Sequence, residues 1–253
     1  RVLNLSLGRP VRESWKLDPL CQAVERAWKA GLVVVVAAGN GGRDNTGGRD
    51  GYGTVLSPGN HPLVITVGAM KTMGSAGRGD DAMASYSSKG PTAIDGVVKP
   101  DLVAPGNRII SLVYNTSNTL TATHPENIVP FSYYMASSGK ASSGAYAWLS
   151  GTSMAAPMVS GAAALMLQKD PSLTPDVVKV RLMRTATKAF PQYSTAVDPV
   201  TGQSFRTQYD LFTVGAGYLD INAALAATDN FKGKNAASPT AVFSAVSNGR
   251  VKL

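Results

Sequence analysis

The sequence predicts an α/β fold of three layers, in which a mostly parallel central sheet lies between helices. Residues 2–8 alternate apolar and polar side chains and end on glycine, a pattern typical of a strand. Asp18 and Pro19 form a helix start, and the helix predicted over 18–29 leads into the valine-rich run 32–38, which suits a strand buried on both faces. A strand, a helix and a strand with short connections form a βαβ unit, whose right-handed crossover makes the two strands parallel.

The alternation of strands and helices continues along the chain. Short apolar runs predict strands over 63–69 and 109–113. Helices are predicted over 153–167, where small apolar residues follow a serine turn, and further on over 175–186 and 221–225. This order of elements favours a sheet that is covered by helices on both faces.

The length of 253 residues suits one large domain or two small ones. We expect one domain over 1–228, followed by a linker or the start of a further module over 229–253, which is rich in alanine, serine and asparagine. The stretch 114–148 lacks helical periodicity and is predicted to be a long connection. Because Arg1 opens directly into a strand, we expect the chain to be truncated at its N-terminus.

Composition excludes several classes of protein. Hydrophobic residues at 44% indicate an ordinary globular chain, and the single cysteine, Cys21, excludes an internal disulfide and favours a buried thiol. The net charge is +8, but the basic residues are scattered and no recognition motif accompanies them, so no nucleic-acid partner is expected. The sequence contains neither an apolar run of transmembrane length nor a signal peptide, and no membrane partner is expected.

The run Gly151–Pro157, with the sequence GTSMAAP, is the most informative motif. It passes directly into an apolar segment, so Ser153 is expected at a helix N-terminus, where the exposed N–H groups and the helix dipole favour negative charge. That is a suitable place for a nucleophilic oxygen. The alternative from the local pattern is an ordinary helix cap, which would explain Thr152 or Ser153 equally well.

A second motif, Ala37-Ala38-Gly39-Asn40, follows the buried strand. A glycine-rich turn after a parallel strand can bind a dinucleotide, but here Asp44 stands where a third glycine is needed. A plain turn is the remaining interpretation from spacing alone.

Together the two motifs resemble those of the subtilisin-like serine proteases, the subtilase family, and the stretches 57–69, 85–91 and 99–106 resemble further parts of that family. The resemblance implies that Ser153 is the nucleophile of a serine endopeptidase that forms an acyl-enzyme, and that the Asn40 amide donates a hydrogen bond to the oxyanion. It also implies a set of substrate-binding residues, namely Ser6, Leu7, Gly8, Ala37, Ala38, Gly39, Leu56 and Thr152. Among these, Leu56 is expected to narrow the primary pocket.

The catalytic base is not found in the sequence. The two histidines, His61 and His124, lie outside the motif in which the family carries its base, and the motif of the orienting aspartate is absent as well. We therefore expect this chain by itself to be inactive, with both groups upstream. The alternative is a noncatalytic, subtilase-like module that binds peptides.

The resemblance also sets expectations for cofactors and partners. No cofactor is required for the chemistry, and structural calcium is expected only by resemblance, with no ligands identified. Asp44, Asn45 and Asp50 form an oxygen-rich loop, but their spacing is not that of an EF-hand, so a surface turn is the default. A polypeptide substrate, the protein's own pro-segment as a second partner, a monomeric state and secretion are expected.

Overall fold

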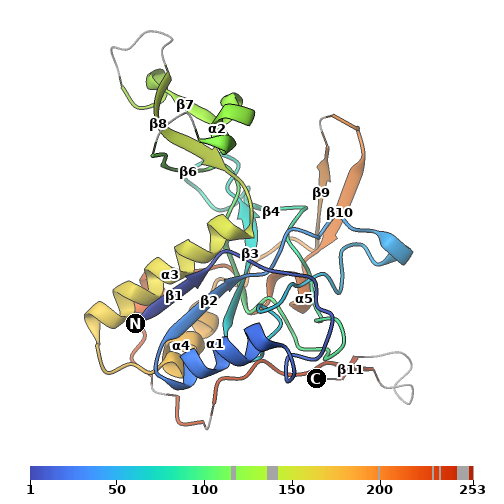
Figure 1. Ribbon diagram of the computed structural model, residues 1–253, viewed down its shortest axis with the longest axis vertical. Helices are drawn as coiled ribbons and strands as arrows, with labels where there is room; N and C mark the ends of the chain where they lie inside the picture. The colour runs from blue at the N-terminus through green and yellow to red at the C-terminus, as the bar shows by residue number, and fades with distance from the viewer. Residues whose placement is uncertain are drawn as a thin grey trace.

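The computed structural model describes residues 1–114, 118–135, 142–198, 200–229, 231–233, 235–243 and 251–252. Its central sheet has the order β1-β2-β3-β4, and β5 also pairs with β3 (Figure 1). These strands are β1 (Val2–Leu5), β2 (Val33–Ala37), β3 (Ile65–Lys71), β4 (Ala82–Met83) and β5 (Leu102–Pro105). All pairings are parallel except that of β4 with β3, so the predicted parallel-rich sheet is confirmed.

Helices cover this sheet. They are α1 (Pro19–Lys29), α3 (Thr152–Lys169), α4 (Pro175–Thr185), α5 (Leu211–Val214) and α6 (Ile221–Ala226). Helix α3 packs along β1, β2, β3 and β5, whereas α1 and α4 contact β2. The four valines of β2 are 0% exposed although successive side chains point to opposite faces, so both faces of the strand are covered. The three-layer α/β/α class is therefore confirmed.

The helix starts follow the predicted capping chemistry. Asp18 accepts a hydrogen bond from the Leu20 amide at 2.8 Å, and Pro19 occupies the first turn of α1. Thr174 caps α4 in the same manner by accepting from the Val177 amide. Helix α3 buries small side chains, among them Ala155, Ala162 and Ala163, so it can approach the sheet closely.

The stretch predicted as a long connection contains regular structure of its own. A separate antiparallel sheet has the order β6-β8-β7, from β6 (Ile109–Leu112), β7 (Ile128–Pro130) and β8 (Ser142–Leu149). Between them lie α2 (Thr119–Thr123), η2 (Pro125–Asn127) and η3 (Phe131–Tyr133). This arm projects from the body in Figure 1. Strand β6 agrees with the strand predicted over 109–113, whereas β7 and β8 were not predicted. They pair with segments distant in sequence, which local periodicity does not reveal.

Two further features were not expected. A hairpin of β9 (Tyr193–Val197) and β10 (Ser204–Gln208) projects beside the arm, and a short 3₁₀ turn, η1, spans Thr46–Gly48 (Figure 1).

Within the described parts of the chain, no helix combines the length and the apolar character needed to cross a membrane.

The described part of the predicted linker packs against the body. The Ser238 amide donates to the Pro62 carbonyl at 2.9 Å, and the Val98 amide donates to the Pro239 carbonyl at 2.8 Å. Ser238 is 7% exposed. The short strands β11 (Val242–Phe243) and β12 (Val251–Lys252) follow. This stretch therefore lies on the domain in an extended conformation, and the domain boundary at 228 stays a prediction.

Candidate active site

Three segments that are distant in sequence meet at one edge of the central sheet. Ser6 follows the end of β1, Asn40 follows the end of β2, and Ser153 lies in the first turn of α3. Parallel strands place their carboxyl ends at the same edge, and α3 begins there. Gly151, the residue before the helix, has φ 157° and ψ 162°, a conformation that side chains disfavour, and a Cβ there would lie 3.3 Å from Asn40 Nδ2. The Asn40 amide therefore lies directly against the start of the helix.

Thr152 holds the Asn40 side chain. Asn40 Oδ1 accepts hydrogen bonds from the Thr152 backbone N–H at 3.0 Å and from Thr152 Oγ1 at 3.1 Å. Thr152 Oγ1 in turn accepts from the Gly39 amide at 3.0 Å, and the Thr152 side chain is fully buried. With its oxygen occupied twice, Asn40 can present only its NH₂ group elsewhere, and among the described residues none accepts from it.

Ser153 and Ser6 form two hydrogen bonds with each other. Ser6 Oγ donates to the Ser153 carbonyl at 2.8 Å, and Ser153 Oγ donates to the Ser6 carbonyl at 3.4 Å. The second contact is long, so the Ser153 hydroxyl is weakly held. Ser153 is half-buried and Asn40 is exposed, so a ligand can reach both.

Leu56 lies between two glycines of the site. A Cβ added at Gly39 would lie 2.7 Å from Leu56 Cγ, and one added at Gly8 would lie 2.9 Å from Leu56 Cβ. The Leu56 amide donates to the Ala38 carbonyl at 3.0 Å. The side chain of Leu56 therefore occupies the space that the two glycines leave open.

The remaining predicted substrate-binding residues differ in exposure. Leu7 is 51% exposed, whereas Ala37 and Ala38 are buried at 5% and 0%. The Ala38 amide donates to the Val67 carbonyl, so its backbone still belongs to the sheet. Ala37 and Ala38 thus support the site from within the core.

Neither histidine contacts Ser153. His61 is buried against the Trp15 ring, and its Nδ1 accepts from the Leu63 amide. His124 lies on the arm beside Glu126, with its Nδ1 3.0 Å from that carboxylate. His61 is therefore a packing side chain of the core, and His124 is a surface side chain.

Tyr86 supports the turn before Ser153, a contact that the sequence did not reveal. Its hydroxyl donates to the Gly106 carbonyl at 2.9 Å, and the same carbonyl accepts from the Gly151 amide at 2.8 Å. Burial raises the pKa of Tyr86 to about 12, so the hydroxyl stays protonated and able to donate. The long sequence separation hides this contact from any local pattern.

Asp101 belongs to a buried ion network. One of its oxygens lies 2.6 Å from Lys99 Nζ and the other 3.1 Å from Lys179 Nζ, and Ser238 Oγ donates to it as well. All three charged residues are at most 1% exposed. Burial acts to raise the pKa of Asp101, but Lys179 and Lys99 outweigh it and the pKa is lowered. Asp101 is therefore structural.

No metal site is visible in the described ranges, where no three His, Cys, Asp or Glu side chains gather. Asp44 Oδ1 accepts from the Thr46 amide and hydroxyl, and Asn45 Oδ1 accepts from the Asp50 amide. These oxygens cap their own turn, which fits a surface turn. Structural calcium elsewhere stays a prediction.

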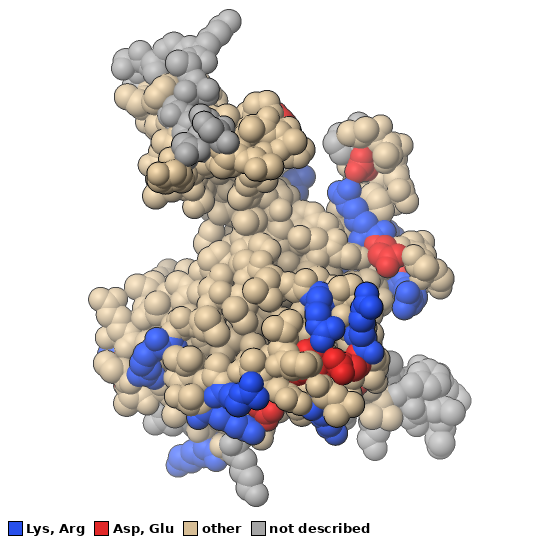
Figure 2. All heavy atoms as spheres, viewed as in Figure 1, with Lys and Arg blue, Asp and Glu red and all other residues tan. Residues whose placement is uncertain are grey.

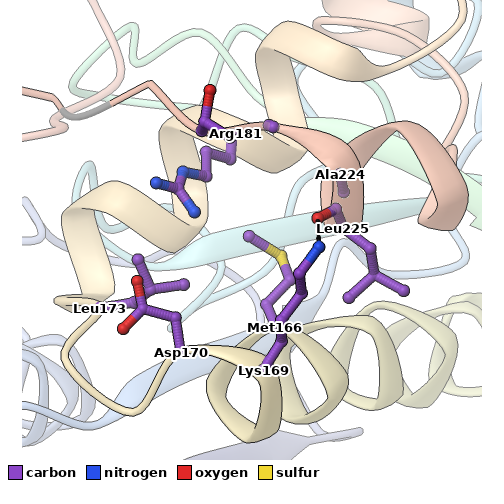
Figure 3. A pocket seen from close by; sticks show the side chains of 9 residues that line it. Met166, Lys169, Asp170, Leu173, Arg181, Ala224 and Leu225 are labelled. Carbon is purple, nitrogen blue, oxygen red and sulfur yellow. Dashed lines mark hydrogen bonds between the residues drawn. The ribbon is translucent and has the colours of Figure 1, made fainter.

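A cavity of about 370 Å³ lies at the opposite end of α3 (Figure 3). Lys169 there donates to the Leu225 carbonyl at 2.8 Å, and Arg181 donates to the Asp229 carbonyl at 2.8 Å. Both cations thus join α3 and α4 to the segment around α6. Helix α3 has 18 residues, so its two ends are about 27 Å apart, and this cavity is separate from Ser153.

Charge is unevenly placed on the face shown in Figure 2, where the body carries most of the Lys, Arg, Asp and Glu side chains and the described arm almost none. The basic side chains lie among acidic ones instead of forming one continuous patch. This face therefore carries no single broad basic surface.

A serine at the start of a helix, beside an asparagine amide and at the carboxyl edge of a parallel sheet, resembles the arrangement of an α/β serine hydrolase. The chain belongs to the subtilase family: the model described as "Subtilase family" matches residues 1–209. The family predicted from the motifs is therefore confirmed.

Two individual relatives agree with this family assignment. The chain is 45% identical over 180 residues to the serine protease AprX of Bacillus subtilis (strain 168), covering 70% of this chain and 36% of the relative. It is 34% identical over 186 residues to subtilisin DY of Bacillus licheniformis, covering 74% and 49%. The chain thus spans less than half the length of these two relatives.

Among solved structures, fervidolysin of Fervidobacterium pennivorans, described as a keratinolytic enzyme related to subtilisin, matches with a TM-score of 0.54 and 26% identity. The match covers 82% of this chain and 24% of that one. The prenylagaramide maturation protease PagA matches with a TM-score of 0.56 and 23% identity over 89% and 61%, which concerns the fold alone.

Proposed function

We propose that this chain carries the nucleophile and the oxyanion donor of a subtilisin-type serine endopeptidase. Ser153 Oγ would attack the carbonyl carbon of a peptide bond and form an acyl-enzyme, while Asn40 Nδ2 donates to the oxyanion. The observation that carries the proposal is the double hydrogen bond from Thr152 to Asn40 Oδ1, which leaves only the NH₂ group to face a substrate.

The start of α3 adds to this stabilisation. The first N–H groups of a helix have no intrahelical partners, and the helix dipole places partial positive charge at that end. Negative charge that develops next to Ser153 would therefore be stabilised. The proton of Ser153 Oγ must pass to a base, and neither His61 nor His124 contacts that oxygen.

This chain spans only part of the length of its relatives. We propose that the base and its orienting carboxylate lie in a longer form of this protein, in the region that corresponds to the rest of the relatives. By itself the chain should hydrolyse peptides negligibly, since the hydroxyl of serine is a weak nucleophile without a base. The second candidate, a noncatalytic peptide-binding module, is supported by the same missing base.

Substrate binding is proposed along the exposed segment Ser6–Gly8, which would pair with an extended peptide as an added strand. Such pairing gives main-chain affinity with little sequence choice. Leu56 would restrict the primary pocket to small side chains because it fills the space between Gly8 and Gly39. Secretion, a monomeric state and binding of a pro-segment are proposals from the family.

A fluorophosphonate probe tests the proposal. Ser153 should react negligibly in this chain alone and readily in a longer protein that supplies the base, and Ser153→Ala should abolish labelling. Ser160→Ala, on the same helix, is the matched control and should leave labelling unchanged. Efficient labelling of the chain alone would contradict the expected inactivity, and no labelling of the longer protein would favour the noncatalytic module.

A further inference from the structure

The turn that carries Asn40 is held by a neighbouring segment, 85–88, which follows β4 in the chain. The Ser88 amide donates to the Gly39 carbonyl at 2.9 Å, and Ser88 Oγ accepts from the Gly41 amide at 3.0 Å. Gly39 and Gly41 are the two neighbours of Asn40 in sequence. One residue therefore fixes the backbone on both sides of the candidate oxyanion donor.

Ser88 is itself fixed within the core. The residue is 0% exposed, and a Cβ added at Gly39 would lie 2.8 Å from Ser88 Oγ, so the hydroxyl lies in close contact with the turn. Within the described residues, Ser88 Oγ is the one hydrogen-bond acceptor of the Gly41 amide. Loss of this hydroxyl would therefore leave the amide without a partner in the protein.

The same segment also holds the next residue of the turn. The Tyr86 carbonyl accepts from the Gly42 amide at 2.8 Å, and a Cβ added at Gly42 would overlap the Ser87 carbonyl oxygen, so the two backbones are in direct contact. The Tyr86 hydroxyl donates to the Gly106 carbonyl, which also accepts from the Gly151 amide. The segment therefore contacts both turns that form the candidate site.

We propose that Ser88 is a positioning residue for the oxyanion donor Asn40, an inference that rests on the function proposed above. Ser88 is buried away from the substrate and holds the backbone on either side of Asn40, while Thr152 holds the Asn40 side chain. An oxyanion donor is most effective when its orientation is fixed before the negative charge develops. Without the contacts from Ser88, the Asn40 amide would spend less time in the orientation that meets the oxyanion.

Amide hydrogen exchange in this chain tests the contact itself. Ser88→Ala should accelerate exchange of the Gly41 amide about tenfold relative to the amides of β2, because the Gly41 amide loses its acceptor. Ser87→Ala is the matched control, since Ser87 is also 0% exposed and its Oγ accepts from the Ala69 amide of β3 at 3.0 Å. This control should accelerate exchange at Ala69 and leave Gly41 unchanged. Equal exchange of Gly41 in wild type and Ser88→Ala would overturn the proposal.

Steady-state kinetics in the proposed longer enzyme test the consequence for catalysis. Ser88→Ala should lower kcat about tenfold with little change in KM, whereas Ser87→Ala should leave both unchanged. Because Ser88 acts through Asn40, Ser88→Ala should cause no further loss of kcat in an Asn40→Ala background. A loss of the same size in both backgrounds would show that Ser88 serves the fold alone, and this result would overturn the positioning role.

The single variant Asn40→Ala distinguishes a failure of the proposed function from a failure of the positioning role. If Asn40→Ala left kcat unchanged, Asn40 would not be the oxyanion donor and both proposals would be overturned. If Asn40→Ala lowered kcat and Ser88→Ala did not, the positioning role alone would be overturned. Should Ser88→Ala fail to fold, Ser88→Cys supplies a sulfur that accepts hydrogen bonds only weakly. It should lower kcat in the same pattern, and an unchanged kcat would count equally against the proposal.

Discussion

Thr152 Oγ1 lies 3.1 Å from Asn40 Oδ1, although the two residues are 112 positions apart in sequence. The contact joins the start of α3 to the end of β2 and orients the amide proposed as the oxyanion donor. Thr152 is therefore a positioning residue, since it acts through Asn40.

Thr152→Val should lower kcat about tenfold in the proposed longer enzyme, with little change in KM. The variant keeps the shape but loses two hydrogen bonds, each worth about 1 kcal/mol, that orient Asn40 and Gly39. Asn40→Ala should cost more, on the order of the 10²–10³ known for the same loss in subtilisin itself. Steady-state kinetics on peptide anilides measure both. Thr185→Val is the control, because the Thr185 hydroxyl forms its hydrogen bond within α4. An equal loss of kcat in this control would contradict the positioning role of Thr152.

Leu56→Gly should widen the primary pocket of that enzyme. The ratio of kcat/KM for Phe over Ala at the P1 position should rise at least about tenfold, because the side chain that fills the space beside Gly39 is gone. Leu56→Ala should give an intermediate ratio, and Leu17→Gly, at an exposed position, should leave it unchanged. An unchanged ratio in Leu56→Gly would show that the residue does not border the pocket.

His61 should make the folded chain less stable as the pH falls. Its folded pKa of about 4 lies below the ordinary 6.5, so the unfolded chain binds the proton more tightly between these values. Stability is fully present above pH 6.5 and decreases towards pH 4, by about 3 kcal/mol from this group. Urea unfolding at pH 7 and pH 4 measures it. His61→Phe should remove this part of the pH dependence, and His124→Phe should retain it. Equal profiles for wild type and His61→Phe would contradict the assignment.

Asp101→Asn should destabilise the fold by about 3–5 kcal/mol at pH 7, because it leaves two buried lysines without their carboxylate. Asp170→Asn, which alters a surface turn, should cost much less. Thermal unfolding measures both. Ser238→Ala is the milder variant and should expose the stretch 235–241 to proteolysis, since this residue joins it to Asp101. A Tm for Asp101→Asn equal to that of Asp170→Asn would contradict the network.

The fold class and the first βαβ unit could be predicted because each depends on local patterns. The continuous valine run of β2 indicates a strand buried on both faces. Asp18 and Pro19 form a local signal for a helix start, which does not depend on the rest of the fold. Strand β6 was predicted, but the rest of the arm could not be, since β7 has three residues and both β6 and β7 gain their stability from pairing with β8. Pairing between distant segments has no local period.

The sequence by itself determined the family, the nucleophile candidate Ser153 and the oxyanion candidate Asn40, because each lies in a contiguous motif. Only the tertiary structure decided that Thr152 holds Asn40, that Leu56 fits between Gly8 and Gly39, and that His61 is buried. Hydrogen bonding and burial depend on which distant segments meet. That depends on strand register and helix packing, and these are set by the whole core instead of by any one stretch.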